Sequence, residues 1–526
     1  MPVDRSELNV ESYCSTRSSA RHFTFEYAIT SGYAPDGGIY VPAGPLPLFT
    51  VSRLKEMMKM DFDQLAFAIL RRFLPLKEID DSQLKSVIDR AYSKFTTENR
   101  VEVVAPSSSP VSIAELFHGP TYCFKDLGLS MLCNLISHFT PPGVEKKRTL
   151  VVSTTGDTGP AALASVDRAA NPNLNILAFF PSGGQISAFQ RLQMTSLSGS
   201  PNIEVVEFCG GGDDMDKPIK VMQKDEDWMK EAGLCGVNSY NIGRPLAQMT
   251  HYFWSVFRTL ESRYGKDCLD PSKTIEENGK FVNVVIPTGA MGNIVACYMS
   301  KHCGLPVGRI TAGVNANDIT HRAFQSGDFS KSAKMEKTLS DAINIQIPYN
   351  MERLLFYATG GDHDKIKGWY DEMDQSDSLQ LDPDFVATLQ TEFSSHRVED
   401  NEMCAMIRSF KANHDYLVDP HTAVALVAAE RQGYFDPVSN SLPTVVMSTA
   451  SPCKFQHSIT VAAGEGEWEA YYASKFPPAG KQLLERAKAG GIAEPVVWEA
   501  SKEGFDRTQI EWEQSARRLI KEKFLL

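Results

Sequence analysis

The stretch TLVVSTTGDTGPAALASVDRAA, residues 149–170, decides the fold of this chain. Its β-branched beginning predicts a buried strand, and the alanine-rich run that starts at Pro160 predicts a helix. FVNVVIPTGAMGNIVACYMSKHCG, residues 281–304, repeats the order of strand, small-residue loop and helix, with Gly304 and Pro306 ending the helix. Further β-branched runs at 175–180, 202–208 and 444–449 alternate with helical segments. This alternation predicts an α/β fold in which helices cover both faces of a parallel sheet.

The composition argues against several kinds of partner. The 526 residues carry 53 Lys and Arg against 65 Asp and Glu, a net charge of −12, whereas a nucleic-acid binder needs a basic face. The longest apolar runs, such as Leu174 to Phe180, are far shorter than the roughly 20 residues of a membrane span. No targeting segment is evident, so we expect a cytoplasmic protein with neither nucleic-acid nor membrane partners. The 10 cysteines form no CxxC pair, which predicts buried, reduced thiols and no metal site.

Three regions follow one another along the chain. Residues 1–105 combine a turn-rich opening, YAPDGGIYVP at 33–42, with helical apolar periodicity, and predict a mainly helical N-terminal module. The Ser/Pro-rich stretch that follows, APSSSPVS at 105–112, marks a boundary. Residues 106–455 hold the alternating strands and helices, and residues 456–526 predict a peripheral helical segment.

Both small-residue loops can direct backbone N–H groups at an anion, and the helix N-terminus behind each loop adds a favourable dipole. Two such loops suggest two acidic groups, for example a cofactor phosphate and a substrate carboxylate or phosphate. Neither loop is a Walker A sequence or the full GxGxxG of a dinucleotide fold. Taken alone, they leave open the alternative that the glycines only let strands turn into helices.

Lys125 lies at the expected start of another helix, in FKDLGLSMLCNLISHF at 124–139. The apolar spacing of Leu127, Met131 and Leu135 predicts that this helix begins near Asp126. The positive end of the helix dipole and the apolar neighbours disfavour the ammonium form of the lysine. A neutral amine is what carbonyl chemistry requires, although an arbitrary lysine is far more often a solvated surface residue.

Taken in order, these segments resemble the threonine synthase family of pyridoxal-phosphate enzymes. The resemblance runs from about Ser15 to Phe455. It includes STR at 15–17, YAPDGGIYVP, HGPTYCFKD at 118–126, TTGDTG at 154–159, FQRLQM at 189–194, NSYN at 238–241, PTGAMGN at 287–293, MERLLF at 351–356, DPHTAV at 419–424 and STASPCKF at 448–455. It implies the type II fold of these enzymes, two parallel-sheet α/β lobes with pyridoxal 5'-phosphate between them.

The resemblance also implies roles on the cofactor side of the site. Lys125 would form the Schiff base with the cofactor and later shuttle protons, and Thr449 would meet the pyridine nitrogen. A hydroxyl there cannot hold a full proton on the ring, which favours elimination. Asp157 would lie beside the ring hydroxyl, as an anion next to a phenolate unless the two share a proton. The cofactor phosphate would be held by Gly289, Ala290, Met291, Gly292 and Asn293.

On the substrate side, the TTGDTG region would hold the carboxylate through Ser153, Thr154, Thr155 and Thr158. Arg244 would bind the substrate phosphate, because a guanidinium can bind phosphate bidentately. Asn238, Ser239 and Asn241 would assist it. His118 is a candidate for proton transfer, and it fits equally well a histidine that hydrogen-bonds a turn.

The function implied is that of a pyridoxal-phosphate-dependent lyase that eliminates phosphate from an O-phosphorylated amino acid. A threonine synthase, which converts O-phosphohomoserine and water into threonine and phosphate, is the first expectation. Ser451 stands where the family usually has His, and we expect this departure to touch the substrate side of the pocket. Residues 317–329 and 345–355 look closer to the threonine synthase-like 2 group. Members of that group degrade O-phosphothreonine to 2-oxobutanoate, which is the alternative.

Two other classes of function are more remote. One is a non-catalytic binding or signalling protein that keeps the fold, and the other is a nicotinamide oxidoreductase, for which the full glycine fingerprint is missing. The expected partner is a small phosphorylated amino acid, and the expected assembly is a monomer or a homodimer.

Overall fold

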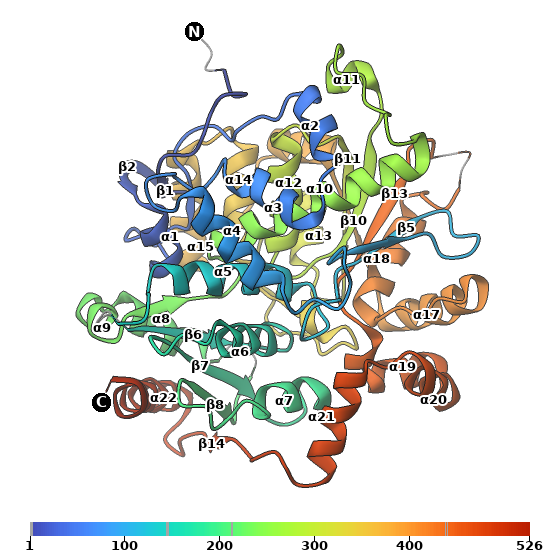
Figure 1. The fold of residues 1–526 in the computed structure, drawn as a ribbon. Coiled ribbons are helices and arrows are strands. Elements are labelled where there is room, and N and C mark those ends of the chain that lie inside the picture. Colours follow the sequence, from blue (N-terminus) through green and yellow to red (C-terminus); the bar gives the residue numbers. More distant parts are fainter. Residues whose placement is uncertain (1–3, 144–146, 212–213, 437, 439, 526) are drawn as a thin grey trace.

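The computed structural model describes residues 4–143, 147–211, 214–436, 438 and 440–525 of the 526. Two sheets, built mainly of parallel strands, form the centres of two lobes, and helices cover them (Figure 1). The five-stranded sheet lies in the lower half of Figure 1, and the six-stranded sheet lies at the upper right. The predicted α/β class and the predicted pair of parallel-sheet lobes are therefore confirmed.

The five-stranded sheet has the strand order β14-β8-β7-β6-β9, and all neighbours are parallel. Its strands are β6 (Arg148–Ser153), β7 (Leu174–Pro181), β8 (Ile203–Phe208), β9 (Leu234–Gly236) and β14 (Val496–Trp498). The β-branched runs at 149–153, 175–180 and 202–208 predict β6, β7 and β8 correctly. Strands β6 and β7 are buried along nearly their whole length, which explains why they are continuous apolar runs without alternation.

The six-stranded sheet has the order β12-β11-β10-β13-β5-β4. Its strands are β4 (Glu102–Val104), β5 (Ser112–Glu115), β10 (Val282–Pro287), β11 (Val307–Val314), β12 (Phe393–Arg397) and β13 (Thr444–Ser448). Strands β10 and β13 are the ones predicted at 281–287 and 444–449, and they pair in parallel. Strand β4 runs antiparallel to β5.

The N-terminal region holds more strand than the sequence predicts. Strands β1 (Tyr13–Ser15), β2 (Ser18–Phe23) and β3 (Tyr40–Pro42) form a small antiparallel sheet. The helices that follow are α1 (Phe25–Ser31), α2 (Val51–Met57), α3 (Phe62–Leu70) and α4 (Asp81–Tyr92). Each begins after a Thr or Asp whose side chain accepts a backbone N–H of the first turn.

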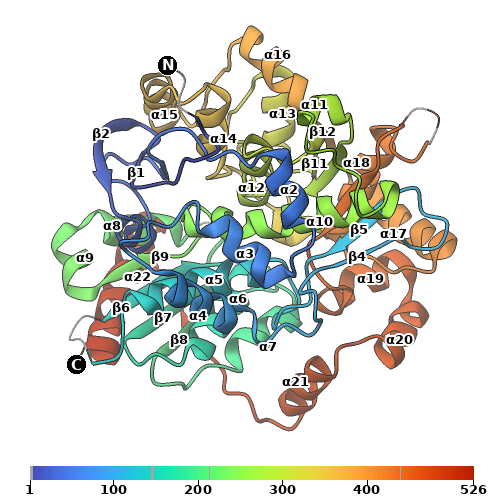
Figure 2. The same cartoon turned by 45° about the horizontal axis from the view of Figure 1, so that its top comes forward.

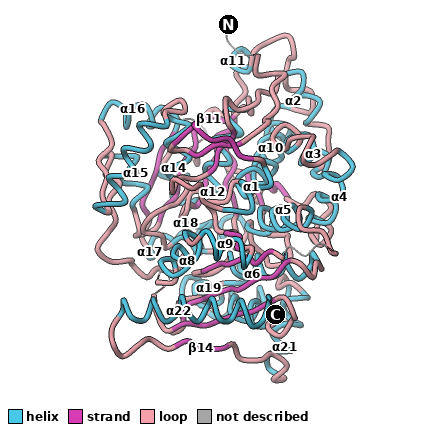
Figure 3. The backbone as a smooth tube through the Cα atoms, turned by 90° about the vertical axis from the view of Figure 1, so that its left-hand side faces the viewer, coloured by secondary structure: helices cyan, strands magenta, loops and turns pink. Residues whose placement is uncertain are grey.

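The division of the chain at residues 105 and 455 stays a prediction, and two strands cross it. Strand β4 precedes residue 106 but joins the six-stranded sheet, and β14 follows residue 455 but joins the five-stranded sheet. The last segment, expected to be helical and peripheral, thus also completes a sheet. Figure 3 shows β14 and the helix α22 (Phe505–Ile520) together at the edge of the molecule.

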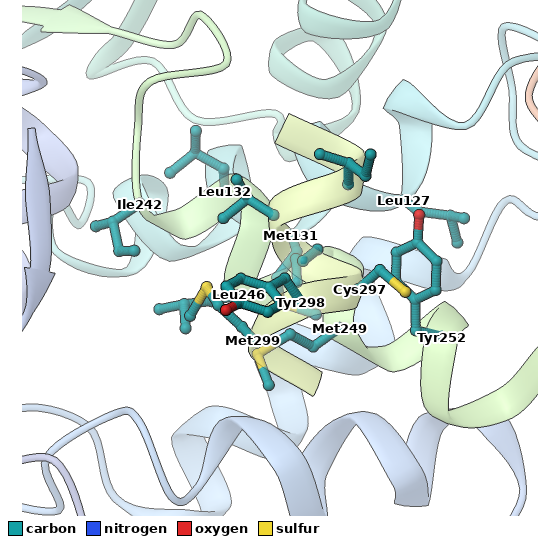
Figure 4. Close-up of a cluster of buried hydrophobic side chains, with 14 of the residues drawn as sticks. Leu127, Met131, Leu132, Ile242, Leu246, Met249, Tyr252, Cys297, Tyr298 and Met299 are labelled. Carbon is teal, nitrogen blue, oxygen red and sulfur yellow. The ribbon is translucent and has the colours of Figure 1, made fainter. Parts of the chain in front are cut away.

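Three helices lie between the two sheets and share one core (Figure 2). They are α5 (Lys125–His138), α10 (Gly243–Tyr264) and α12 (Gly292–His302). Figure 4 shows side chains of all three in contact, including Met131 of α5, Met249 of α10 and Met299 of α12, and all three methionines are fully buried. A common core of this kind holds the N-terminal ends of the helices in a fixed relation to one another.

The remaining α-helices surround the sheets. They are α6 (Thr158–Ala169), α7 (Ala188–Thr195), α8 (Asp216–Lys224), α9 (Glu226–Ala232), α11 (Ile275–Asn278), α13 (Ile319–Ser326), α14 (Met351–Ala358), α15 (His363–Ser376), α16 (Pro383–Glu392), α17 (Asp400–His414), α18 (Pro420–Arg431), α19 (Gln456–Ala463), α20 (Glu465–Ser474) and α21 (Pro478–Lys488). Among the described residues, no helix combines the length and the apolar character that a membrane crossing needs.

Candidate active site

A pocket lies between the two lobes, where β6, β10 and β13 end. The loop after β6 contributes residues 153–158, the loop after β10 contributes residues 287–294, and Thr449 follows β13. Ligands of α/β proteins usually bind at the carboxyl ends of parallel strands, as here. The predicted site residues that line this pocket are Lys125, Ser153, Thr154, Thr155, Asp157, Thr158, Asn238, Ser239, Arg244, Gly289, Ala290, Met291, Gly292, Asn293 and Thr449.

Two predicted residues do not line the pocket. The ring of His118 pairs with Glu115 across 2.7 Å, and the His118 carbonyl accepts the N–H of Thr96. Asn241 is buried, donates to the carbonyls of Ile29 and Gly236, and accepts the N–H of Gly243. Asn241 therefore supports the start of α10, and any role of either residue in the chemistry stays a prediction.

Lys125 is the first residue of α5, one position before Asp126, near which the apolar spacing predicts the start of the helix. The backbone N–H of Phe124 donates to the carbonyl of Thr449 at 2.8 Å, which ties the start of α5 to the end of β13. The side chain is partly buried, and removal of water from its ammonium lowers the pKa of Lys125, although the nearby Asp157 carboxylate works in the opposite direction. The position thus favours a neutral amine more than a surface position would.

Arg244 is a buried cation without a carboxylate partner among the described residues. It is 2% exposed, one guanidinium nitrogen donates to the carbonyl of Val237 at 3.2 Å, and its Nε has no partner. Burial lowers the pKa of Arg244 from 12.5 to about 10. An arginine in this state is costly unless an anion enters the pocket beside it.

The loop after β10 ends at the N-terminus of α12. No side chain caps this helix, and within the described part of the chain the N–H groups of Gly292 and Asn293 have no hydrogen-bond partner. Met291, at the cap position, adopts a left-handed backbone with φ of 62° although it is not glycine. Free N–H groups at a helix N-terminus bind phosphate or carboxylate groups, so this wall of the pocket fits an anion.

The loop after β6 divides its hydroxyl groups between structure and pocket. The Thr154 hydroxyl accepts the N–H groups of Gly156 and Gly159, both at 3.1 Å, and so holds the loop itself. The Ser153 hydroxyl is buried at the pocket wall and has no hydrogen-bond partner among the residues that the structure describes. Gly159 leaves no room for a side chain, because a Cβ there would lie 2.5 Å from Thr154 Cγ2.

Three polar residues of the pocket were missed by sequence reasoning. Gln248 stands one helical turn after Arg244, and its Oε1 is buried without a partner. Asp216 accepts the hydroxyl of Tyr349, and both line the pocket. The spacing of Arg244 and Gln248 on one helix face was a usable signal for Gln248. Asp216 and Tyr349 come from distant segments, and no local pattern joins them.

His421 is a fourth missed residue, although DPHTAV contains it. Its Nδ1 pairs with Asp419 at 2.7 Å, and its Nε2 accepts the N–H of Ala342 at 3.1 Å. These partners place the ring proton on Nδ1. Burial opposes a charge on the ring, but the hydrogen bond to Asp419 and the attraction of the nearby carboxylates together outweigh burial and raise the pKa of His421. His421, and not His118, is the histidine of the pocket wall.

Ser451 lies outside the pocket lining. It is 4% exposed, its hydroxyl shares a hydrogen bond of 3.1 Å with the Tyr471 hydroxyl, and it accepts the N–H of Cys453. The departure from the family's usual histidine thus lies in the packing against α20 and not at the pocket wall, contrary to the expectation from the sequence that it would touch the substrate side.

Comparison with known proteins agrees with the fold and the pocket. The family descriptions "Threonine synthase N terminus" and "Threonine synthase, C-terminal" match residues 12–92 and 422–499. The chain is 34% identical to the threonine synthase of Saccharomyces cerevisiae over 475 residues, which cover 86% of this chain and 88% of that protein. It is 35% identical to threonine synthase-like 2 of Pongo abelii over 450 residues, with coverage of 86% and 89%.

A solved structure extends the likeness to the whole fold. The PLP-bound threonine synthase of Brucella melitensis superposes with a TM-score of 0.80 at 29% identity, and the match covers 96% of this chain and 99% of that one. Such similarity, in sequence and in architecture, over most of both chains means that this protein belongs to the threonine synthase family of pyridoxal-phosphate-dependent lyases with the type II fold.

Proposed function

We propose that this lyase eliminates phosphate from an O-phosphorylated amino acid, and that it acts as a threonine synthase on O-phosphohomoserine. Arg244 supports this proposal most directly. It is a buried guanidinium for which the described part of the chain provides no counter-charge, and it lies close enough to Lys125 to help lower the pKa of the lysine. A guanidinium binds phosphate through two parallel hydrogen bonds, so a phosphate group of the substrate would supply the missing anion.

The pocket fits pyridoxal phosphate in three respects. The uncapped start of α12, with the free N–H groups of Gly292 and Asn293, would hold the cofactor phosphate. Lys125 would bond the aldehyde, and Thr449 would meet the ring nitrogen. When bound, pyridoxal phosphate supplies a sink for the electrons left when the amino acid loses its Cα proton.

The residues of the chain would divide the remaining work. Lys125 Nζ, whose ammonium form is disfavoured by burial, would accept and return protons at the substrate. The guanidinium of Arg244 would hold the substrate phosphate until its bond to carbon breaks. The free hydroxyl of Ser153, together with the amides of the loop after β6, would orient the substrate carboxylate.

A second substrate, O-phosphothreonine, is favoured by one observation. Ile343, Ile345 and Tyr349 line the pocket, and they lie in or beside the segment 345–355 that resembles the threonine synthase-like 2 group. The sequence identity to threonine synthase-like 2 of Pongo abelii, 35%, is also nearly the same as the sequence identity to the yeast threonine synthase, 34%. On this alternative the chain would degrade O-phosphothreonine to 2-oxobutanoate, ammonia and phosphate.

The test is to incubate the protein, loaded with pyridoxal phosphate, with each phosphorylated amino acid separately and to assay threonine, 2-oxobutanoate and free phosphate. Threonine from O-phosphohomoserine supports the main proposal, and 2-oxobutanoate from O-phosphothreonine alone supports the second. Lys125→Ala should abolish either product. Lys301→Ala is the matched control. Lys301, like Lys125, is a partly buried lysine at one end of a core helix, in this case the last turn of α12, but it pairs with Glu392 outside the pocket. Phosphate release from neither compound would contradict both proposals.

The setting of the enzyme is part of the proposal. We propose a cytoplasmic location for it, because cysteines without disulfide bonds are typical of a reducing compartment. We propose a monomer or a homodimer as its assembly, and we propose units at 1–105, 106–455 and 456–526 for its chain.

A further inference from the structure

Lys454 is a buried lysine that the proposed reaction does not use. It ends the short helix η2 (Pro452–Lys454) and is 1% exposed. Its Nζ donates to the Thr121 carbonyl at 2.8 Å and to Gln193 Oε1 at 3.0 Å, and it forms an ion pair with Asp157 Oδ1 at 2.9 Å. An ammonium has three N–H donors, so all of them are engaged. Lys454 is therefore a fixed cation and cannot carry protons for the reaction.

The partner of Lys454, Asp157, is bound through only one of its two carboxylate oxygens among the described residues. Asp157 Oδ1 also accepts the Nε2 of Gln190 at 2.8 Å, so both of its strong bonds fall on one oxygen. Asp157 Oδ2 has no hydrogen-bond partner within the described residues, and Asp157 lines the pocket wall. Two side chains thus hold the carboxylate through Oδ1, and Oδ2 is left as an acceptor.

Both members of the pair keep their charges at neutral pH. Burial works against each charge, but the opposite charges nearby, above all that of the partner, together outweigh it, so the pKa of Asp157 falls to about 2 and the pKa of Lys454 rises. The other ionisable groups that face Asp157 from the surrounding elements are Lys125 of α5 and His421 of α18, which favour its ionised form, and Asp341, Cys123 and Cys453. A carboxylate in this state can accept a hydrogen bond but cannot donate one.

The connectivity of pyridoxal phosphate indicates which of its atoms would face this acceptor. The aldehyde that bonds Lys125 lies between two ring substituents, the phosphate-bearing arm on one side and the ring hydroxyl on the other. If the arm points to the loop at Gly289–Asn293, the hydroxyl points to the opposite side of Lys125. Asp157, in the loop after β6, lies on the wall that belongs to the other lobe.

We propose that Lys454 is a positioning residue, which holds Asp157 as a fixed, charged acceptor for the ring hydroxyl of the cofactor and so keeps the proton on that hydroxyl. The proposal rests on the placement of the cofactor given under the proposed function. A carboxylate would repel an ionised ring oxygen beside it, whereas it would accept a hydrogen bond from a ring hydroxyl. The pair would thereby set the protonation state of the cofactor without contact between Lys454 and any reacting atom.

The test uses the loaded enzyme and records its absorption spectrum against pH, because ionisation of the ring hydroxyl changes the spectrum of the bound cofactor. The variants are Asp157→Asn, Lys454→Met and the two together. In the double variant an amide replaces the charged acceptor, and the pH midpoint of the spectral transition should fall. The fall should be smaller than the about 1–3 units that loss of one nearby charge causes, because the ammonium, which lies farther from the hydroxyl, is lost together with the carboxylate. A double variant with the midpoint of the unchanged protein would overturn the proposal.

Thermal unfolding of the cofactor-free protein separates this effect from mere loss of structure. Each single variant leaves one buried charge unpaired and should unfold at a lower temperature, whereas the double variant should regain much of the loss. A spectral shift that persists in the double variant therefore reports the cofactor and not a weakened fold. A double variant less stable than either single variant would overturn the pairing.

A matched control is Glu352→Gln, which breaks the buried ion pair between Arg17 and Glu352 at 3.0 Å, away from the pocket. It should lower the unfolding temperature and leave the spectral midpoint unchanged, and an equal shift in this variant would overturn the proposal. Failure of the proposed function can be told apart from failure of this inference. If borohydride fixes no cofactor on Lys125 of the protein without substitutions, both the proposed function and this inference are overturned. An active, loaded protein with an unresponsive double variant would overturn this inference alone.

Discussion

Replacement of Arg244 by methionine should stabilise the ligand-free protein and impair the enzyme. The burial that lowers the pKa of Arg244 from 12.5 to about 10 corresponds to about 3 kcal/mol of unfavourable free energy in the folded state. Methionine removes this cost and loses one hydrogen bond, to the Val237 carbonyl, worth about 1 kcal/mol. The free energy of unfolding should therefore rise by about 2 kcal/mol, which urea unfolding of the cofactor-free protein can measure.

The same substitution removes the proposed phosphate contact. Two charge-assisted hydrogen bonds between guanidinium and phosphate contribute at least about 3 kcal/mol, and each 1.4 kcal/mol corresponds to about tenfold. The kcat/KM for the phosphorylated amino acid should thus fall by about 100-fold or more. Steady-state assays of phosphate release measure this loss, and uptake of pyridoxal phosphate by the variant should persist.

Arg353→Met is the matched control. Arg353 is also a fully buried arginine, and burial lowers its pKa to about 10 as well. Its guanidinium, however, donates to the carbonyls of Tyr40 and Tyr240 at 2.8–3.1 Å and to Asn350, so methionine leaves three buried acceptors without a donor. Arg353→Met should therefore destabilise the protein. If Arg244→Met destabilises it equally and leaves kcat/KM unchanged, Arg244 is a structural residue and the reasoning is refuted.

Three further predictions concern stability. Burial raises the pKa of Asp341 to about 6 from 3.8, so ionisation of this carboxyl costs stability as the pH rises through this range. In urea unfolding, Asp341→Asn should therefore raise the free energy of unfolding by up to about 3 kcal/mol above pH 7 and by clearly less near pH 5. An equal gain at the two pH values would contradict burial of the charge as the cause. Gly159→Ala should lower the thermal midpoint, because the new Cβ would meet Thr154, whereas Gly368→Ala, in open space on α15, should raise it slightly; the opposite order would contradict the packing argument. Ser451→His should lower the free energy of unfolding by about 1–3 kcal/mol, because the larger side chain overpacks against Tyr471. The ratio of threonine to 2-oxobutanoate should stay unchanged, and a changed ratio would mean that position 451 affects the reaction.

The strands and the loops at the ends of β6 and β10 could be predicted from the sequence because they depend on local patterns. A β-branched run of six residues followed by a small-residue loop and an alanine-rich segment has few other ways to fold. The start of α5 at Lys125 is equally local, since apolar spacing indicates the helix. The small sheet β1–β3 and the edge strand β14 were missed, because short strands gain their stability from partners far along the chain.

The sequence by itself determined the α/β class, the two loop-to-helix turns and the identity of the lysine at a helix start. Only the tertiary structure decided which charged groups lack a partner in the pocket and which have one. Arg244 and Lys454 are both buried cations. Arg244 has no carboxylate partner among the described residues, whereas Lys454 pairs with Asp157, and nothing in the sequence around either residue indicates this difference. Likewise, His421 and not His118 lines the pocket. The physical reason is that burial and ion pairing depend on how segments hundreds of residues apart pack together, whereas strand and helix formation depend mainly on residues within a few positions of one another.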